Sequence, residues 1–337
     1  MSEWHPFKWQ PAEPRMPFAG RWAVLAGAAS GLLVRLVFWG NPGNAYAAMT
    51  ASFILGSPAI VGFVTVYVAE RQQRRSWIYY FTAPAIACAF YVLGSLLVLI
   101  EGWICALVIF PLFALVAGLA GLLMGLVCRM TNWPRRAVVS SVALLPLLGG
   151  AFEQRIGTDV VEGIQQRETF VAATPAEVWS VLMDTRDIRP EEVDGAWMYR
   201  IGVPTPREGI EEFRGGEHLR HITMGKGIHF DQVAVEWREN RRVTWNYRFG
   251  PDSFPPGALD DHVRIGGEYF DVPESTCELT PVPGGTRLSI RMRYRVKTHF
   301  NWYALRVANF LVRDFTGVIV DFYARRAAAA HVQAGSS

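Results

Sequence analysis

The feature that most constrains this chain is the uneven distribution of charge along it. Between Trp22 and Phe152, 131 residues include nine charged side chains, whereas residues 153–337 include 23 basic and 26 acidic ones. A helix needs about 20 consecutive apolar residues to cross the hydrocarbon core of a bilayer. The first stretch is long enough for several crossings, and the second has the composition of a domain in water. The sequence therefore predicts an integral membrane protein with a separate soluble domain.

The apolar stretch is predicted to form an α-helical transmembrane bundle of about five spans. Aromatic residues that favour the headgroup region, such as Trp22, Trp77 and Trp103, lie at the proposed ends. Four segments lack the polar face that a soluble helix needs. The fifth has 16 residues and contains Pro146, so a re-entrant or interfacial segment is the alternative there. The expected spans are 22–39, 45–69, 77–100, 103–128 and 137–152.

Short connections that contain Lys or Arg alternate along this bundle with connections that contain neither. Basic residues precede the first span and lie between spans two and three and between spans four and five, whereas 41–44 and 101–102 contain none. Because cytoplasmic loops carry an excess of Lys and Arg, residues 1–21 are predicted to be cytoplasmic. We expect a multi-pass protein of the inner, or plasma, membrane. Five spans would place the second half in the periplasm of a Gram-negative bacterium, and four would place it in the cytoplasm.

The net charge of +3 combines two opposite halves. Residues before 153 contribute +6, and the later residues contribute −3. No basic stripe of the kind that binds nucleic acid is indicated. Three of the four cysteines lie in apolar spans and Cys277 is alone in the second half, so there is neither a disulfide framework nor a metal-ligand spacing. We expect no metal and no cofactor, and the pattern indicates no oligomeric state.

The second half has the periodicities of an α+β domain. After a linker at 153–164 and a short strand, Thr174 and Glu177 form a capping box at the start of a helix. Apolar residues then alternate with period two, as in strands. A helix at 300–330 carries a continuous apolar stripe and precedes a tail at 331–337 that we expect to be disordered. The strand-like runs are 168–172, 233–237, 243–249 and 286–297.

Several motifs of this half resemble the START-like helix-grip superfamily, which includes polyketide cyclases/dehydrases and lipid-transfer domains. TPAEVWSVLMD at 174–184 and PVPGGTRLSIRMRY at 281–294 are similar to its opening and closing motifs. GVPTPREG at 202–209 and GGEHLRHITMGKGIHFDQVAVEW at 215–237 resemble a branch found behind several membrane spans.

The resemblance covers 165–326 and implies a helix-grip domain at 165–330. Such a domain curves an antiparallel sheet around a long C-terminal helix and leaves a cavity for a lipid or another hydrophobic small molecule. Polar groups in the cavity would orient the ligand head or transfer protons. The residues expected to bind the ligand are Arg220, His221, His229, Trp245, Tyr247, Tyr294, Leu311 and Phe315. Further polar candidates are Asp231, His262 and Glu268.

His218 and His221 form an HxxH pair on a predicted strand. Side chains three residues apart on a strand point to opposite faces, so the pair is not expected to share a metal. The sequence also lacks a Ser–His–Asp ordering, a phosphate-binding glycine loop and a paired carboxylate that would name a reaction.

Functions of different classes remain open. The first is a membrane-tethered domain that binds a lipid or another hydrophobic molecule close to the bilayer. The alternative is a cyclase or dehydratase that uses pocket His and carboxylate residues as acid and base. A third interpretation is a signalling or assembly protein whose pocket gates the spans. Because the superfamily has no universal catalytic motif, the motifs alone do not decide between binding and catalysis.

Overall fold

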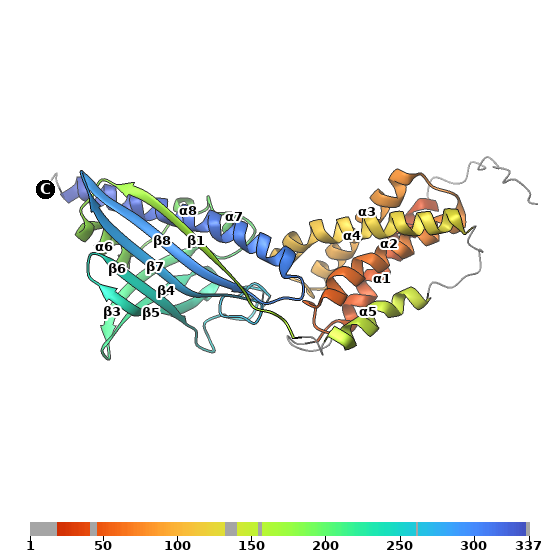
Figure 1. Cartoon of the computed structure of the whole chain (residues 1–337), viewed down its shortest axis with the longest axis horizontal. Helices are drawn as coiled ribbons and strands as arrows, with labels where there is room; N and C mark the ends of the chain where they lie inside the picture. The colour runs from red at the N-terminus through yellow and green to blue at the C-terminus, as the bar shows by residue number, and fades with distance from the viewer. Residues whose placement is uncertain (1–18, 41–45, 132–139, 154–156, 261, 335–337) are drawn as a thin grey trace, which may run out of the picture. The chain divides into compact units, whose positions relative to one another are not determined.

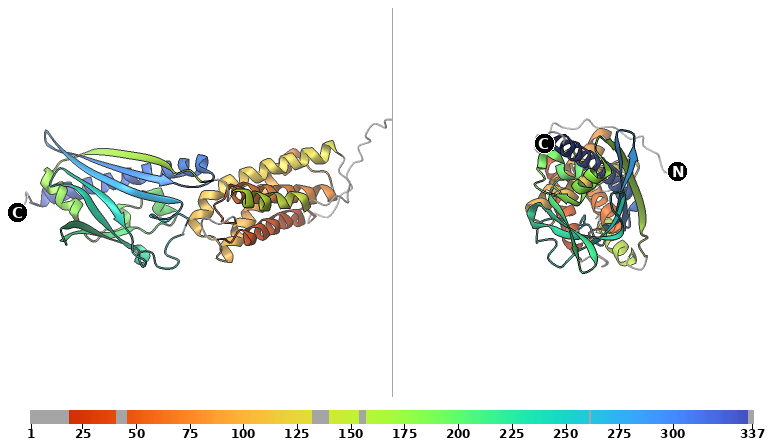
Figure 2. Two further views of the ribbon diagram at one scale, coloured as in Figure 1. Left: turned by 60° about the horizontal axis from the view of Figure 1, so that its bottom comes forward. Right: turned by 90° about the vertical axis from the view of Figure 1, so that its left-hand side faces the viewer.

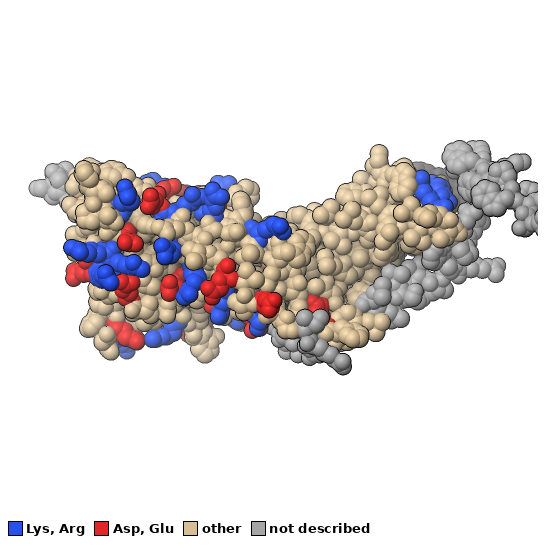
Figure 3. Space-filling view, in the orientation of Figure 1, with Lys and Arg blue, Asp and Glu red and all other residues tan. Residues whose placement is uncertain are grey.

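The computed structural model describes residues 19–40, 46–131, 140–153, 157–260 and 262–334. The chain divides into two compact units. The first contains the helical residues up to 157, and the second contains residues 158 onward together with the segment 101–108. On the face shown in Figure 3, charged side chains are spread over the second unit and are sparse on the helices of the first. Most of the predicted N-terminal segment 1–21 lies outside the described residues.

The first unit consists of helices that follow the expected spans (Figure 1). Residues 137–139 of the expected fifth span lie outside the described part of the chain. Side chains cap two of the helices, because Thr50 Oγ1 accepts a hydrogen bond from the backbone of Phe53 and Ser76 Oγ accepts one from Tyr79. The helices are α1 (Ala19–Val37), α2 (Ala51–Gln72), α3 (Trp77–Leu97), α4 (Trp103–Met130) and α5 (Ser140–Glu153).

The expectation of about five membrane spans is corrected by these helices. By length and composition, three helices of the described chain are suited to cross a membrane, namely α2, α3 and α4. The helix α5 has 14 residues, which at about 1.5 Å per residue falls short of a hydrocarbon core of about 30 Å. The helix α1 has 19 residues and contains two charged ones, Arg21 and Arg35.

Glycines bring α4 into direct contact with the backbones of its neighbours. A Cβ atom at Gly121 would lie 2.1 Å from the carbonyl oxygen of Tyr80 in α3. A Cβ at Gly62 of α2 would lie 2.3 Å from the carbonyl oxygen of Ala117. Small residues at helix interfaces allow this approach, which maximises dispersion contacts where lipid supplies no hydrophobic drive. The packing of this unit therefore depends on the absence of side chains at these positions.

Polar groups mark the two ends of the helical unit. At one end, the carboxylate of Glu153 in α5 accepts hydrogen bonds from the backbone nitrogens of Ala51 (2.5 Å) and Ser52 (2.8 Å) at the start of α2. At the other end, Arg129 of α4 donates from Nη2 to the carbonyl oxygen of Arg75 (2.9 Å), just after α2. The end of α5 thus lies beside the start of α2, and the end of α4 lies beside the end of α2.

The second unit is a curled antiparallel sheet with a long C-terminal helix along its concave side, which fits the helix-grip fold (Figure 2). Its described strands have the order β1-β8-β7-β6-β5-β4-β3-β2. The strands are β1 (Val161–Val171), β2 (Asp184–Thr185), β3 (Pro206–Arg214), β4 (Glu217–Met224), β5 (His229–Arg238), β6 (Arg242–Arg248), β7 (Phe270–Val282) and β8 (Gly285–Val296). The helices are α6 (Pro175–Met183), α7 (Trp197–Arg200) and α8 (Asn301–Ala334), with single 3₁₀ turns η1 (Pro190–Glu192) and η2 (Gly225–Gly227).

Alternation specifies the central strands, and hairpin turns connect them. Asn240 (φ 56°) and Gly284 (φ 81°) adopt the left-handed conformation that tight turns require, in the hairpins β5–β6 and β7–β8. The alternation predicted for β8 is confirmed, because its apolar side chains are buried while arginines occupy the other face. The buried apolar side chains of β8 are Leu288, Ile290, Tyr294 and Val296.

The first strand is longer than the predicted run at 168–172. It begins at Val161, inside the expected linker, and pairs with β8 from Val161 opposite Val296 to Val171 opposite Thr286. As an edge strand with mostly exposed side chains, β1 carries little hydrophobic signal. The capping box of α6 is present as predicted, because Thr174 and Glu177 exchange side chain to backbone hydrogen bonds.

The helix α8 faces the sheet with residues that differ in part from the predicted stripe. Leu311 and Phe315 are half-buried, whereas Val312 and Thr316 are almost fully buried. The physical reason is that α7 and α6 cover the flank of α8 on which Phe315 lies, so the helix has more than one buried side. The buried positions of α8 are Ala308, Val312, Thr316, Val320, Phe322, Tyr323 and Ala327.

Candidate ligand-binding site

Apolar clusters fill the concave side of the helix-grip domain. The largest lies around Trp179, Trp245 and Leu288 and includes Val320 and Tyr323 of α8. A second cluster joins β7 and β8 to α8. A third lies beside β4, β5 and β6, and several of its members are partly exposed although they belong to an apolar cluster. The partly exposed members are Ile222, Met224, Tyr247, Phe249, Phe254 and Leu259.

Arg220 is a buried, positively charged side chain on the concave side of the sheet. It lies on β4, and because side chains alternate along a strand, it shares the concave face with Ile222 and Met224. The side chain is 6% exposed. Its Nη2 donates to the hydroxyl of Tyr323 in α8 (2.7 Å), and its Nη1 donates to Oε1 of Gln232 in β5 (3.3 Å). A charged group this deep is expensive unless its partners compensate for lost water.

The groups that accept hydrogen bonds from Arg220 are an amide and a hydroxyl, and further uncharged groups lie in the interior. The hydroxyl of Tyr247 donates to Oγ of Ser275 (2.9 Å). Burial raises the pKa of Tyr247 and of Tyr199. Burial also raises the pKa of the Cys277 thiol to about 11. All three are therefore uncharged at neutral pH, and none of them balances the guanidinium.

Of the other predicted residues, Trp245 and Tyr294 are buried in the apolar clusters, whereas Leu311 and Phe315 are half-buried. Trp245 is 1% exposed and packs edge-on against Trp237. Tyr294 is fully buried, and its hydroxyl donates to Oδ1 of Asn309 (2.7 Å). On α8, Leu311 is half-buried and Phe315 meets the ring of Tyr199. Contact with a ligand stays a prediction for all four.

His221 and His229 are not brought together with Arg220. His221 occupies the opposite face of β4, where Nδ1 lies 2.6 Å from Oδ1 of Asp231 and Nε2 lies 3.3 Å from Oε2 of Glu212. Burial lowers the pKa of His221, but the two carboxylates outweigh this effect and raise it overall. His229 is half-exposed and lies 3.5 Å from Asp252. The structure thus separates the predicted polar set into an inner and an outer group.

The remaining polar candidates also pair outside this interior. Glu268 accepts a hydrogen bond from Nζ of Lys297, and the ring of His262 lies 5.8 Å from that of Tyr269. No group of three or more His, Cys, Asp or Glu side chains among the described residues is arranged to hold a metal ion.

Sequence reasoning missed several members of the inner group. His218 stacks on Trp237 with ring centroids 3.7 Å apart, and its Nδ1 lies 2.6 Å from Oε1 of Glu211. Glu211 pairs with Arg220 across β3 and β4 and so shares the concave face, yet its carboxylate engages His218. Gln232 was also missed, although its alternation with Phe230 and Ala234 along β5 is a signal that could have found it.

Comparisons with known proteins show weak likenesses. No protein-family profile matches the sequence, and no curated protein gives a significant match. A protein of Thermus thermophilus is 17% identical, with 50% of this chain and 99% of that chain covered and a TM-score of 0.32. Truncated norcoclaurine synthase from Thalictrum flavum is 14% identical, with 50% and 94% covered and a TM-score of 0.31. At these values the likenesses carry no argument, and the fold rests on the sheet order and helix position.

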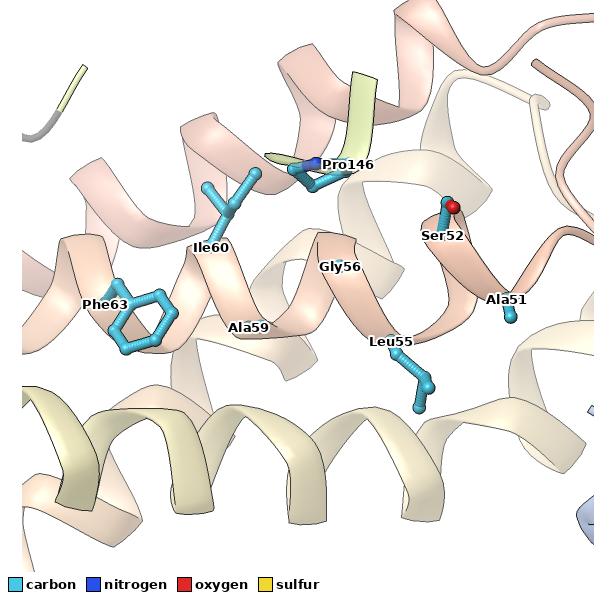
Figure 4. Close-up of a pocket in the computed structure, with 8 residues that line it drawn as sticks. All are labelled: Ala51, Ser52, Leu55, Gly56, Ala59, Ile60, Phe63 and Pro146. Atoms are coloured by element: carbon cyan, nitrogen blue, oxygen red, sulfur yellow. The ribbon is translucent and has the colours of Figure 1, made fainter. Parts of the chain in front are cut away.

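The helical unit contains a separate apolar groove of about 310 Å³ (Figure 4). It lies along the first half of α2 and is closed on one side by Pro146 of α5. The lining residues are Ala51, Ser52, Leu55, Gly56, Ala59, Ile60, Phe63 and Pro146. Ser52 is the sole polar side chain among these lining residues. The groove could therefore contact an apolar chain but has few polar groups to select a particular ligand.

Proposed function

We propose that the protein is a membrane-anchored helix-grip domain that binds a lipid or another hydrophobic small molecule between its sheet and α8. One observation carries the proposal. Ile222, Met224 and Phe249 belong to an apolar cluster of this domain, yet they are partly exposed. By comparison, Trp245 and Leu288 in the largest cluster of the same domain are fully buried. Partly exposed apolar side chains beside a buried polar group are typical of ligand sites.

The binding test uses full-length protein purified in detergent and mass spectrometry of its extracted small molecules. Met224→Trp fills the concave face and should abolish co-purification of the ligand. Thr223→Trp is the matched control, because the adjacent residue of β4 points to the other face. If no hydrophobic molecule co-purifies with the unaltered chain, or if both variants retain it equally, the proposed binding function is wrong.

Anchoring in the inner membrane is proposed from α2, α3 and α4. The N-terminus is proposed to be cytoplasmic and the helix-grip domain periplasmic, a topology that requires α1 and α5 to cross the bilayer in addition to α2, α3 and α4. The basic residues Arg71, Arg74 and Arg75 follow or end α2, so the positive-inside rule assigns that end of the unit to the cytoplasm. Glu153 bonds the start of α2, at the other end. The chain therefore leaves the helical unit on the side away from the basic residues.

Paired reporters fused after Gly157 test this topology. Alkaline phosphatase should be active at this position, and a cytoplasmic fluorescent protein should be dark. The reverse pattern would show that α5 returns to the side from which it started, and it would move the domain to the cytoplasm. A fusion after Arg75 is the matched control and should show cytoplasmic fluorescence.

A second candidate function is acid–base catalysis on the bound molecule. The pair His218–Glu211 favours it, because it lies on the concave face with a short contact of 2.6 Å. A His beside a carboxylate is a common general base. Wild-type protein incubated with a cell extract should then give a product lighter by the elements of water, and His218→Gln should not. Identical mass profiles for the two proteins would leave binding alone.

A further inference from the structure

Arg220 is a cation whose partners within the protein are incomplete. A guanidinium carries N–H donors on every nitrogen. In Arg220, Nη1 and Nη2 reach Gln232 and Tyr323, and the ring of Tyr323 lies 5.8 Å from the guanidinium carbon. The Nε atom is buried and has no hydrogen-bond partner in the described protein. No carboxylate of the described residues forms an ion pair with this side chain.

Two other arginines of the same sheet have the counter-charge that Arg220 lacks. Arg242 and Arg293 also have a buried Nε without a hydrogen bond. Each of them, however, lies beside a glutamate, with Arg242 Nε 3.0 Å from Glu236 and Arg293 Nη2 3.2 Å from Glu274. A buried cation without a counter-charge destabilises the folded protein, because its lost hydration is not replaced. Arg220 thus differs from its neighbours in the one component that offsets this cost.

The sheet is shaped to keep this guanidinium in place. Gly209 of β3 lies opposite Ile222 and beside Arg220, and a Cβ atom there would lie 2.7 Å from Nη2 of Arg220. A side chain at this position would require the ends of the Arg220 and Ile222 side chains to shift. The partly exposed apolar side chains of Ile222 and Met224 follow Arg220 along the same face of β4. The guanidinium of Arg220 therefore lies at one end of the apolar surface that Ile222 and Met224 form.

We propose that the molecule bound by the helix-grip domain is an anionic amphiphile whose carboxylate head pairs with Arg220 and whose apolar chain lies along Ile222 and Met224. The inference rests on the proposed binding function and names its ligand class. A carboxylate matches the planar fork of a guanidinium and can accept hydrogen bonds from two of its nitrogens at once. The hydroxyl of Tyr323 accepts one hydrogen bond from the guanidinium. A neutral alcohol of the same chain length would leave the cation unbalanced.

The test compares two photoreactive probes, palmitic acid and hexadecanol that carry a diazirine at the same chain position. Full-length protein in nanodiscs is labelled with each, and crosslinked peptides are mapped by mass spectrometry. Peptides from α2–α4, which contact the bilayer, serve as the internal reference. Peptides of β4–β6 and α8 should be labelled about tenfold more by the acid, the ratio that about 1.4 kcal/mol produces. Arg220→Gln should reduce this ratio to near one.

Controls separate the failure of this inference from the failure of the proposed function. Arg293→Gln removes an arginine of the same sheet that already has a glutamate, and it should leave the ratio unchanged. Equal labelling of the domain by acid and alcohol in the unaltered protein would overturn the carboxylate assignment and keep hydrophobic binding. No labelling of the domain by either probe would overturn both. If Arg220→Gln does not fold, Arg220→Lys, which keeps the charge, should retain a preference for the acid.

Discussion

Arg129 of the helical unit and Arg220 of the helix-grip domain differ in how their charge is balanced. In the helical unit, Arg129 donates to the hydroxyl of Tyr80 (3.2 Å) and lies over the ring of Trp77, and the same hydroxyl donates to the carboxylate of Glu70 (2.8 Å). The positive and negative groups thus share one network. In the domain, Arg220 has neutral partners and an unpaired Nε. The first arrangement is complete by itself, whereas a bound anion would complete the second.

Packing also differs between the two units, because the helices are in close contact whereas the domain leaves apolar side chains partly exposed. The helices approach until backbone meets backbone at Gly62 and Gly121. The domain leaves apolar side chains such as Ile222 and Met224 partly exposed on its concave face. A close-packed interior loses stability with any added atom, while a ligand site tolerates change and loses binding instead. The following predictions test this contrast.

The largest effect is expected for Gly121→Ala in α4. The added methyl group would meet the carbonyl oxygen of Tyr80, and overpacking of this kind costs about 3 kcal/mol. Unfolding of the helical unit in a denaturing detergent titration should shift accordingly. Gly317→Ala in α8 is the matched control, since no atom lies within 4 Å of its Cβ position. It should stabilise α8 slightly, and equal destabilisation by both changes would contradict the contrast.

Val312→Ala should have the next largest effect. Val312 is 3% exposed between α8 and the sheet, and loss of its methyl groups should cost about 2 kcal/mol. Hydrogen exchange of β8 amides in the full chain measures the loss. Leu311→Ala, one position earlier on a half-buried face, should cost clearly less. A larger loss of stability for Leu311→Ala would show that Leu311 faces the sheet, as predicted from the sequence.

A smaller effect is expected for Arg326→Gln. Arg326 donates to both carboxylate oxygens of Glu192 (2.9 and 2.8 Å) and to two backbone carbonyls, which fixes η1 against α8. Because the pair lies near the surface, the loss at pH 7 should be about 1 kcal/mol. Arg325→Gln removes a hydrogen bond to the backbone oxygen of Glu192 and should cost less.

The same pair predicts a pH dependence. The hydrogen bond from Arg326 holds the pKa of Glu192 down at about 2. A lowered folded-state pKa stabilises above the unfolded value, near 4.5, and this contribution disappears as the pH falls towards 2. Hydrogen exchange around η1 should therefore accelerate between these values in the unaltered protein. Arg326→Gln should show a flatter profile, and an equally steep one would exclude this pair as the cause.

The smallest effect concerns His221 on the outer face of β4. Its raised pKa means that protonation stabilises the folded domain below the unfolded pKa, and that this stabilisation is lost as the pH rises through the folded value. Because His221 is well exposed, His221→Gln should change stability by less than about 0.5 kcal/mol. Binding of the acid probe should not change. Loss of binding in this variant would place the ligand on the wrong face of the sheet.

Features of the fold that depend on neighbouring residues could be predicted from the sequence. The capping box at Thr174, the alternation in β8 and the long final helix needed only neighbouring residues, and the structure contains all three. The edge strand β1 was predicted too short, because backbone pairing with β8 specifies it rather than an apolar face. The number of suitable membrane helices was overestimated, since total apolar length does not show where α5 begins.

The candidate site was harder to predict because it depends on which strands and helices meet. Arg220 and Tyr247 were selected, but their partners Tyr323 and Ser275 come from distant segments. His221 was selected with Arg220 although adjacent strand positions face opposite sides, the same periodicity that separates the two histidines of the HxxH pair. Glu211 lies outside the quoted motifs, and the motif that contains Gln232 gives it no role, so only the strand register shows that both lie beside β4.

The close approach of Gly209 to Arg220 has a genetic consequence. With a Cβ position 2.7 Å from Nη2, residue 209 can gain a side chain only if the guanidinium of residue 220 moves or is absent. In a saturation library selected for stably folded protein, substitutions at 209 should therefore be tolerated less well in the arginine background than after residue 220 is shortened. Descendants of this chain would then divide into two lineages, one that keeps glycine with arginine and one that has lost both together with the preference for acids.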